Sequence, residues 1–194
     1  MAIRSVIHVG NPLLKAPNRL IEDFKSSYIK SLILDLKDTM AHEGLIGIAA
    51  PQIGENVRVF ITHPTNTPFR NIGKVDDLRV YINPTIISTS SEQVEIFEGC
   101  GCVPGINEFG PVTRPKEIKI CAYDENQQLF ELYCDGILAR VIQHELDHLS
   151  GIEFLEKITD IKTIVDRKYY IDNIKSSPST KQKSMITKIE YKKL

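Results

Sequence analysis

The stretch DGILARVIQHELDHLSG, residues 135–151, predicts a helix that lies inside the folded domain. Its apolar residues recur at helical spacing and cover much of the circumference, which is typical of a buried helix. Asp135 is a typical N-cap residue at its start, and Gly151 indicates its end. The same helix carries the pattern His-Glu-x-x-His at residues 144–148. The chemistry of this pattern is therefore expected in the interior of the domain.

Two histidines four positions apart on a helix can bind one metal ion. At roughly 100° per residue, His144 and His148 lie about 40° apart and one turn along the axis, so both imidazoles reach the same ion. Glu145 falls on the flank of that face, where a carboxylate can act on a water molecule without taking a coordination position. The alternative is that both histidines are ordinary polar partners. Their place in an apolar helix argues against it, because buried imidazoles and carboxylates need partners.

A catalytic metal usually has three protein ligands, so a third ligand is required. The extended zinc-protease pattern His-Glu-x-x-His-x-x-Gly-x-x-His matches through Gly151 and fails at Phe154. The acidic residues that follow, Glu156, Asp160 and Asp166, have no helical motif around them. The remaining good donors are the thiolates in EGCGCVPG, residues 98–105, which offers two cysteines.

The composition predicts one globular domain. The 194 residues are 42% hydrophobic and 25% charged, which is ordinary for a folded protein. A net charge of -1 provides no overall field toward nucleic acid or an anionic membrane, and we expect neither as a specific partner. No apolar run approaches the roughly 18 residues needed to cross a bilayer, and the first residues lack the apolar core of a signal peptide. We therefore expect a cytoplasmic protein with reduced cysteines.

Other segments predict an α+β fold. Apolar residues recur every four positions from Asp23 to His42, which predicts an N-terminal helix that stops at Gly44. A strand is expected near residues 57–61. Further short strands, mostly antiparallel, are predicted for RVYINP (79–84), TIISTS (85–90), EQVEIFEG (92–99), EIKICAYD (117–124) and QLFELYC (128–134). We thus expect antiparallel or mixed sheets packed around a central His-Glu-x-x-His helix.

The last twenty residues differ in composition from the rest. Residues 175–194 hold six lysines and one glutamate, and they start with a Ser/Pro/Lys-rich run. This pattern predicts a basic, flexible tail after a catalytic domain of residues 1–174. A solvated end is one interpretation, and contact with an anionic partner is the other.

Three separated motifs resemble those of the peptide deformylase family. EGCGCVPG (98–105) resembles the family's Glu-Gly-Cys-Leu-Ser-x-Pro, QHELDHLSG (143–151) matches Gln-His-Glu-x-Asp-His-Leu-x-Gly, and GIAAPQ (47–52) is similar to part of Gly-x-Gly-Leu-Ala-Ala-x-Gln. INP (82–84) and LAR (138–140) are weaker matches, and the resemblance spans about residues 5–160. It implies a metal-dependent hydrolase that removes the formyl group from the initiator methionine of nascent proteins.

The resemblance also implies roles for individual residues. Cys100, His144 and His148 would hold Fe²⁺, or Zn²⁺ as in some members. Glu145 would take a proton from water and return it to the leaving amine. Two donors, the Gln52 side-chain amide and the Gly101 backbone N–H, would stabilise charge on the formyl oxygen.

The implied partner is an N-formyl-methionyl nascent peptide lying as an added strand. Its main chain would pair with Ile46, Gly47 and Gly99, and its methionine would enter a pocket formed by Ile46, Ile96, Ile137, Val141 and His144. Because the substrate emerges at the ribosome, the basic tail suggests ribosome contact.

This chain departs from the family pattern at several positions. Leu45 stands where a glycine is expected, and leucine disfavours positive φ. Gly101 replaces a leucine, and Cys102 replaces a serine and is expected to be a small packed side chain. GINEFGPVTR (105–114) is one residue longer than expected, without an arginine between its ends. The alternatives are therefore an amidase with altered acyl or N-terminal residue specificity, or a non-catalytic protein that binds nascent chains.

Overall fold

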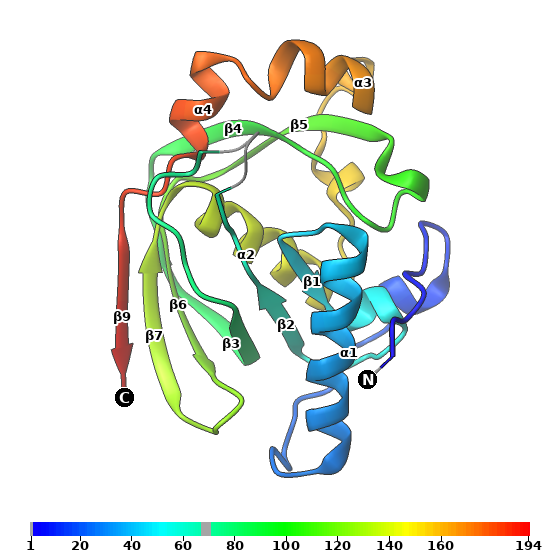
Figure 1. Cartoon of the computed structure of the whole chain (residues 1–194), viewed down its shortest axis with the longest axis vertical. Coiled ribbons are helices and arrows are strands. Elements are labelled where there is room, and N and C mark those ends of the chain that lie inside the picture. The colour runs from blue at the N-terminus through cyan, green and yellow to red at the C-terminus, as the bar shows by residue number, and fades with distance from the viewer. Residues whose placement is uncertain (1, 67–70) are drawn as a thin grey trace.

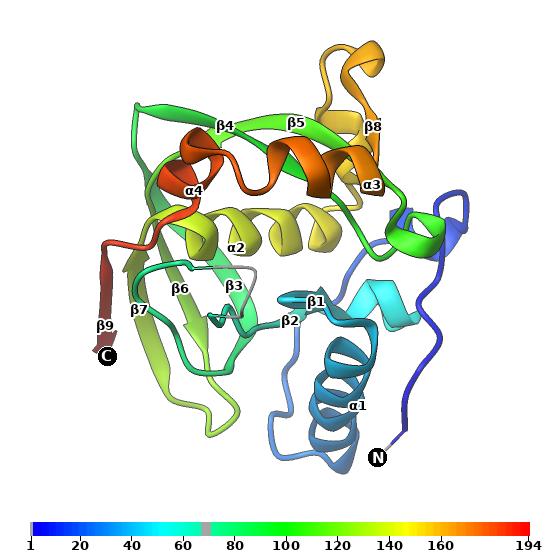
Figure 2. The ribbon, with the colours of Figure 1, turned by 45° about the horizontal axis from the view of Figure 1, so that its top comes forward.

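The computed structural model describes residues 2–66 and 71–194, and it has the predicted α+β fold. Helix α2 (Gly136–Leu149) runs through the middle of the molecule, with a large sheet on one side and a small sheet across the other (Figures 1 and 2). The prediction of antiparallel sheets around a central helix is confirmed. None of the described helices is both long and apolar enough to cross a lipid bilayer.

Both sheets are antiparallel and each presents an edge to the region around α2. The large sheet has the strand order β1 (Gly47–Ala49), β2 (Val59–Thr62), β3 (Arg79–Thr89), β6 (Ile118–Tyr123), β7 (Leu129–Cys134) and β9 (Ile189–Lys193). The small sheet has the order β4 (Gln93–Glu98), β5 (Glu108–Pro115) and β8 (Val165–Asp166). Strands β1 and β4 are therefore both edge strands.

The N-terminal helix α1 (Ser27–Glu43) starts later than the apolar pattern predicts. Ser26 is its N-cap, and the Ser26 side chain accepts a hydrogen bond from the backbone N–H of Ile29. The helix ends at Gly44 as predicted, because Gly44 adopts a left-handed conformation with φ 65°. Most of the expected stripe is buried, but Phe24 is half-buried and precedes the helix, and Tyr28 is 41% exposed.

Two strand predictions differ from the structure. RVYINP and TIISTS form the single strand β3 instead of two strands, since Asn83 takes a left-handed conformation with φ 51° and the register shifts there without a break. Strand β5 was not predicted, because its glycine and prolines read as a loop.

One hydrophobic core joins α2 to the large sheet. Leu138 and Ile142 of the helix lie in the same buried cluster as Phe60, Tyr81 and Phe130 of the strands. The rings of Phe60 and Tyr81 stack at 4.4 Å between centroids. This packing fixes the helix that carries both histidines.

Short helical turns complete the fold. They are 3₁₀ helices at Pro12–Lys15, Ala50–Ile53, Pro104–Ile106, Phe154–Lys157 and Ile161–Thr163, followed by α3 (Arg167–Tyr169), a π-helical turn (Tyr170–Ile174) and α4 (Pro178–Ser184).

The C-terminal residues correct the expectation of an unpacked, flexible tail. Ile186 is 1% exposed and belongs to the main core, and β9 pairs with β7. The carboxylate of Asp135 accepts hydrogen bonds from the backbone N–H groups of Thr187 and Lys188 at 2.8 and 2.9 Å. Asp135 occupies the N-cap position of α2 but makes no side-chain cap bond, because its oxygens serve this later segment. Burial of a few apolar residues outweighs the polar composition that predicted a tail.

Candidate active site

Three predicted metal ligands lie together. His144 and His148 project from one face of α2, and Cys100 follows β4 two residues after its end. One donor atom from each residue lies within 4.8 Å of the others, and all three residues are buried. Cys100 Sγ is 3.2 Å from His148 Nε2. The structure therefore contains a Cys/His/His metal site on α2.

Glu98 fixes the orientation of His144. Its carboxylate lies 2.9 Å from His144 Nδ1, which leaves Nε2 as the free ligand nitrogen. Arg114 donates two hydrogen bonds to Glu98, at 2.7 and 2.9 Å, and Arg140 donates a third at 2.9 Å. Although burial raises the pKa of Glu98, hydrogen bonds from Arg114 and His144 hold it well below its usual range. Glu98 thus acts both as the partner of His144 and as the partner of two arginines.

Asp147, which also lies on α2, makes no hydrogen bond to the ligand histidines among the described residues. It accepts from Arg114 at 2.6 Å and lies 3.6 Å from Lys157 Nζ. Its role is to hold Arg114 from the side opposite Glu98.

The donor set fits a divalent metal ion. Burial lowers the pKa of His148, so this imidazole stays neutral and its nitrogen can coordinate. The hydrogen bond with Cys102 and burial raise the pKa of Cys100 in the metal-free chain, so a nearby cation is needed to stabilise its thiolate. Two imidazoles and one thiolate form the three-ligand set of a catalytic site.

Glu145 lies beside this site with one unused oxygen. Its side chain is buried, and Oε2 has no hydrogen-bond partner in the described part of the chain. Burial raises its pKa well above the usual value. A Cβ at Gly47 would lie 2.6 Å from Glu145 Oε1 and 2.5 Å from Val141 Cγ2, so only glycine leaves room for the carboxylate there.

Gln52 is oriented by a backbone bond. The N–H of Ala49 donates to Gln52 Oε1 at 2.7 Å, so the oxygen of the amide is occupied and the NH₂ group faces the metal site. Nε2 lies 3.8 Å from Cys100 Sγ. The 3₁₀ turn Ala50–Ile53, which buries Gln52, fixes this geometry.

The unusual residues around Cys100 are packed together. Leu45 lies over Gly101, where an added Cβ would be 3.2 Å from Leu45 Cδ1. Among the described residues, the non-glycine residues with positive φ are Asn83 and Gln127. Leu45 therefore has a negative φ, and replacing the motif's glycine by leucine does not strain its backbone. Cys102 is 1% exposed and packs in a small core, and its N–H donates to Cys100 Sγ at 3.4 Å. The four cysteines are free thiols.

The edge of strand β1 that does not pair with β2 faces the site. The carbonyl of Ile46 accepts from His63 N–H on the β2 side, at 2.8 Å. Because bonded and non-bonded pairs alternate along an antiparallel ladder, the next residue, Gly47, directs its N–H and C=O to the opposite edge.

A cavity of about 330 Å³ connects these groups. The predicted residues that line it are Ile46, Gly47, Gln52, Ile96, Gly99, Cys100, Gly101, Ile137, Val141, His144 and Glu145. Sequence reasoning missed Phe109 and the C-terminal residues that line the cavity, namely Arg167, Tyr170, Ile171, Lys175, Thr180, Lys181 and Ser184. The tyrosines and isoleucines between 169 and 189 were the available signal that this segment packs.

Comparison with known proteins decides the family. The family model described as polypeptide deformylase matches residues 3–163. The chain belongs to the peptide deformylase family. This deformylase is 38% identical to the peptide deformylase of Lachnoclostridium phytofermentans over 161 residues, covering 81% of this chain and 90% of that protein. It is 34% identical to peptide deformylase 2 of Clostridium perfringens, covering 86% of this chain and 100% of that protein.

Solved deformylase structures have the same fold. The Met-Ala-Ser-bound class I type b enzyme from Acinetobacter baumannii superposes with a TM-score of 0.76 at 31% identity, covering 81% of this chain and 99% of that one. The Thermotoga maritima deformylase gives 0.72 at 29% identity, covering 82% and 100%. The deformylase described here is a metallo-hydrolase that removes the formyl group from an N-terminal methionine. Its residues after 163 lie beyond the family model's match.

Proposed function

We propose that this deformylase acts on formyl-methionyl nascent peptides in the cytoplasm, with an iron(II) ion held by Cys100, His144 and His148. Support for a reducing compartment comes from the four free thiols. Two imidazoles and a thiolate suit ferrous iron and also zinc, which is the alternative. The bound ion would lower the pKa of a water molecule and polarise the formyl carbonyl. Metal analysis after anaerobic purification distinguishes the two ions, and because ferrous iron and thiolate both oxidise, air should inactivate the iron form.

In this proposal Glu145 moves the proton. Its unpartnered Oε2 is the observation that supports the role most directly, because a buried carboxylate oxygen beside the metal-binding residues can accept a proton from water there. A raised pKa also suits a group that must afterwards return the proton to the leaving nitrogen. Glu98 supports the reaction only through His144, which it orients.

Two donors would stabilise the charge that develops on the formyl oxygen. Gln52 contributes its NH₂ group, which Ala49 orients before any substrate binds. Gly101 contributes its backbone N–H, next to Cys100. Because Ala49 already orients the Gln52 amide, this donor would need no reorganisation during the reaction.

The peptide would lie between β1 and β4. Both are edge strands, and Gly47 of β1 and Gly99, which follows β4, line the cavity. The methionine side chain would enter the apolar part of the cavity, formed by Ile46, Ile96, Ile137 and Val141 together with the ring of His144.

Formate release from formyl-Met-Ala-Ser by anaerobically prepared enzyme tests this function. The Glu145→Gln variant keeps the shape of the side chain and should retain metal while losing about 10²-fold or more in kcat. Absence of formate release from fully metallated wild type would reject the proposal. Binding of the formyl peptide without turnover would favour a nascent-chain-binding protein, and release from other acyl-amides alone would favour the altered-specificity amidase.

The ribosome is a second proposed partner, suggested by six lysines against one glutamate in residues 175–194. Deletion of this segment would remove Ile186 from the core, so charge substitutions are the better test. Lys192→Gln with Lys193→Gln should weaken salt-sensitive co-sedimentation with ribosomes. Unchanged co-sedimentation would end this hypothesis.

A further inference from the structure

Residues 167–184, called here the C-terminal wall, line the cavity that holds the metal site. The wall consists of α3, the π-helical turn and α4, and it crosses above α2 in Figure 2. Arg167, Tyr170, Lys175 and Lys181 contribute to the cavity lining. The whole wall lies after residue 163, where the family model's match ends. This part of the cavity is therefore specific to the present chain relative to that model.

The wall is fixed at both ends. At its start, β8 pairs with β5, and the N–H of Arg167 donates to the carbonyl of Asn107 at 2.7 Å. Past its end, the N–H of Ile186 donates to the carbonyl of Ile72 at 2.7 Å, and Asp135 holds the next residues. The wall residues are thus held against the cavity by the fold on each side.

The wall also packs against strand β5, next to the edge strand β4 along which the peptide is proposed to lie. The ring of Tyr170 stacks on Phe109, with centroids 4.1 Å apart and planes at 7°. Phe109 in turn covers Gly99, where an added Cβ would lie 2.6 Å from its ring. Only the ring of Phe109 therefore separates Tyr170 of the wall from the backbone of Gly99.

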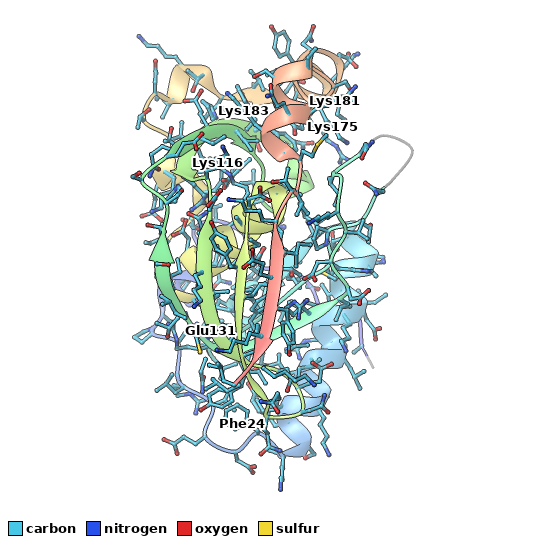
Figure 3. The ribbon with its side chains drawn as sticks, turned by 90° about the vertical axis from the view of Figure 1, so that its left-hand side faces the viewer. Phe24, Lys116, Glu131, Lys175, Lys181 and Lys183 are labelled. Carbon is cyan, nitrogen blue, oxygen red and sulfur yellow. The ribbon has the colours of Figure 1, made fainter. Side chains whose placement is uncertain are left out.

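The charges that the wall brings to the cavity are positive. Arg167, Lys175 and Lys181 are basic, whereas its one acidic residue, Asp172, pairs with Lys168 at 2.5 Å. Figure 3 shows Lys175 and Lys181 at the same end of the molecule, around α4.

Two of the three acidic residues that line the cavity, Glu98 and Glu145, are buried at the metal site and do not lie on the wall. Glu98 is buried and neutralised by Arg114 and Arg140, and Glu145 is buried beside the metal site. Glu43 lines the cavity from the end of α1, which is not part of the wall.

We propose that the C-terminal wall gives this deformylase a preference for formyl-methionyl peptides with aspartate or glutamate in the residues after methionine. The inference rests on the proposed function, which places the formyl group at Glu145 and the methionine in the apolar part of the cavity. The following residues then run along β1 and β4 and pass the wall. Cationic side chains there attract carboxylates over distances up to about a Debye length, about 10 Å at moderate salt.

The test compares kcat/KM for three formylated, C-terminally amidated peptides: formyl-Met-Ala-Ser, formyl-Met-Asp-Glu and formyl-Met-Lys-Lys. At low salt the acidic peptide should exceed the neutral one by about threefold to tenfold, and the basic peptide should fall below it. High salt should shrink the difference, since screening weakens exposed charges.

Charge-neutral variants assign the effect to the wall. Arg167→Gln combined with Lys181→Gln should abolish most of the acidic preference and leave kcat/KM for formyl-Met-Ala-Ser within about twofold. Lys183→Gln is the matched control, because Lys183 lies on the same helix as Lys181 and is not among the residues that line this cavity. Lys183→Gln should lower the acidic preference much less than the double variant does, because its side chain does not line the cavity.

The outcomes separate this inference from the proposed function. Equal kcat/KM for the three peptides, or an acidic preference that survives in the double variant, would overturn the inference while leaving deformylation intact. If even formyl-Met-Ala-Ser releases no formate from metallated wild type, the proposed function fails first.

Discussion

The side chain of Leu45 covers the backbone of Gly101, so that a Cβ at Gly101 would lie 3.2 Å from Leu45 Cδ1. Each residue departs from the motif it belongs to, one replacing a glycine by leucine and the other a leucine by glycine. In the family motifs the leucine stands at the position of Gly101 and the glycine at the position of Leu45, whereas in this chain the two residue types are exchanged. We therefore expect the two departures to compensate each other, so that each is less disruptive in the presence of the other.

A double-mutant cycle tests this coupling. Gly101→Leu in the presence of Leu45 should overpack the contact, cost about 1–3 kcal/mol of stability and lower kcat/KM about tenfold. The double variant Leu45→Gly with Gly101→Leu should recover most of both losses. Thermal unfolding and formate release measure the two effects, and strictly additive losses would contradict the pairing.

Substitution of Glu98 should affect both the metal and the fold. Glu98→Gln leaves Arg114 and Arg140 without a full counter-charge in the interior, which is expected to destabilise the protein by about 3–5 kcal/mol. Loss of the carboxylate from His144 should also weaken metal binding by about 10- to 100-fold. Urea unfolding and competition with a chelator provide the measurements. Glu92→Gln, which breaks only the exposed pair with Lys116, is the control and should stay within about 1 kcal/mol of wild type.

The two cysteines after β4 should respond differently to substitution. Cys100→Ala removes a donor atom of the three-residue set, so the purified protein should contain little metal. Cys102→Ser keeps the backbone N–H that contacts Cys100 Sγ, so metal content should be retained, at some cost in stability because the hydroxyl is buried. Elemental analysis of both variants decides the matter, and loss of metal only in Cys102→Ser would reverse the assignment.

The attachment of the C-terminal strand depends on Asp135. Asp135→Ala removes the acceptor for the N–H groups of Thr187 and Lys188 and should cost about 1–3 kcal/mol. Asp135→Asn keeps one acceptor oxygen and should cost less. Denaturant unfolding gives the stability, and limited proteolysis should cut after residue 175 sooner in the alanine variant. Equal protection in both variants would show that β9 holds the segment without this anchor.

Acid should weaken the same attachment through Glu117. Hydrogen bonds from Lys188 and Tyr133 lower the pKa of Glu117 below its usual value. A carboxyl with a depressed folded pKa adds stability above its unfolded pKa and loses that stability as the pH falls through the folded pKa. Glu117→Gln should therefore reduce the fall in unfolding free energy between neutral pH and about pH 3, by a small amount because the pair is at the surface. Identical pH profiles would exclude a contribution from this group.

Much of the site could be predicted from the sequence because its determinants are local. The helix period fixes the spacing of His144 and His148, and the apolar pattern of α2 predicts that this helix is buried. The helix end at Gly44 follows from glycine's access to the left-handed region. Strand β5 escaped prediction because Gly110, Pro111 and Pro115 resemble loop residues, while their partners on β4 make them a strand.

The sequence by itself determined the α+β class, the helix that carries Glu145 and the two histidine ligands, since residue type and short-range spacing suffice for these. The choice of Cys100 over Cys102 as the third ligand came from the resemblance to the deformylase motif. Only the tertiary structure decided that Glu98 serves His144 and two arginines at once, and that Leu45 covers Gly101. It also decided that residues between 167 and 184 line the cavity, although the polar composition of residues 175–194 had suggested a free tail. These features depend on contacts between residues far apart in the chain, and their energy comes from burial and pairing that no local pattern encodes.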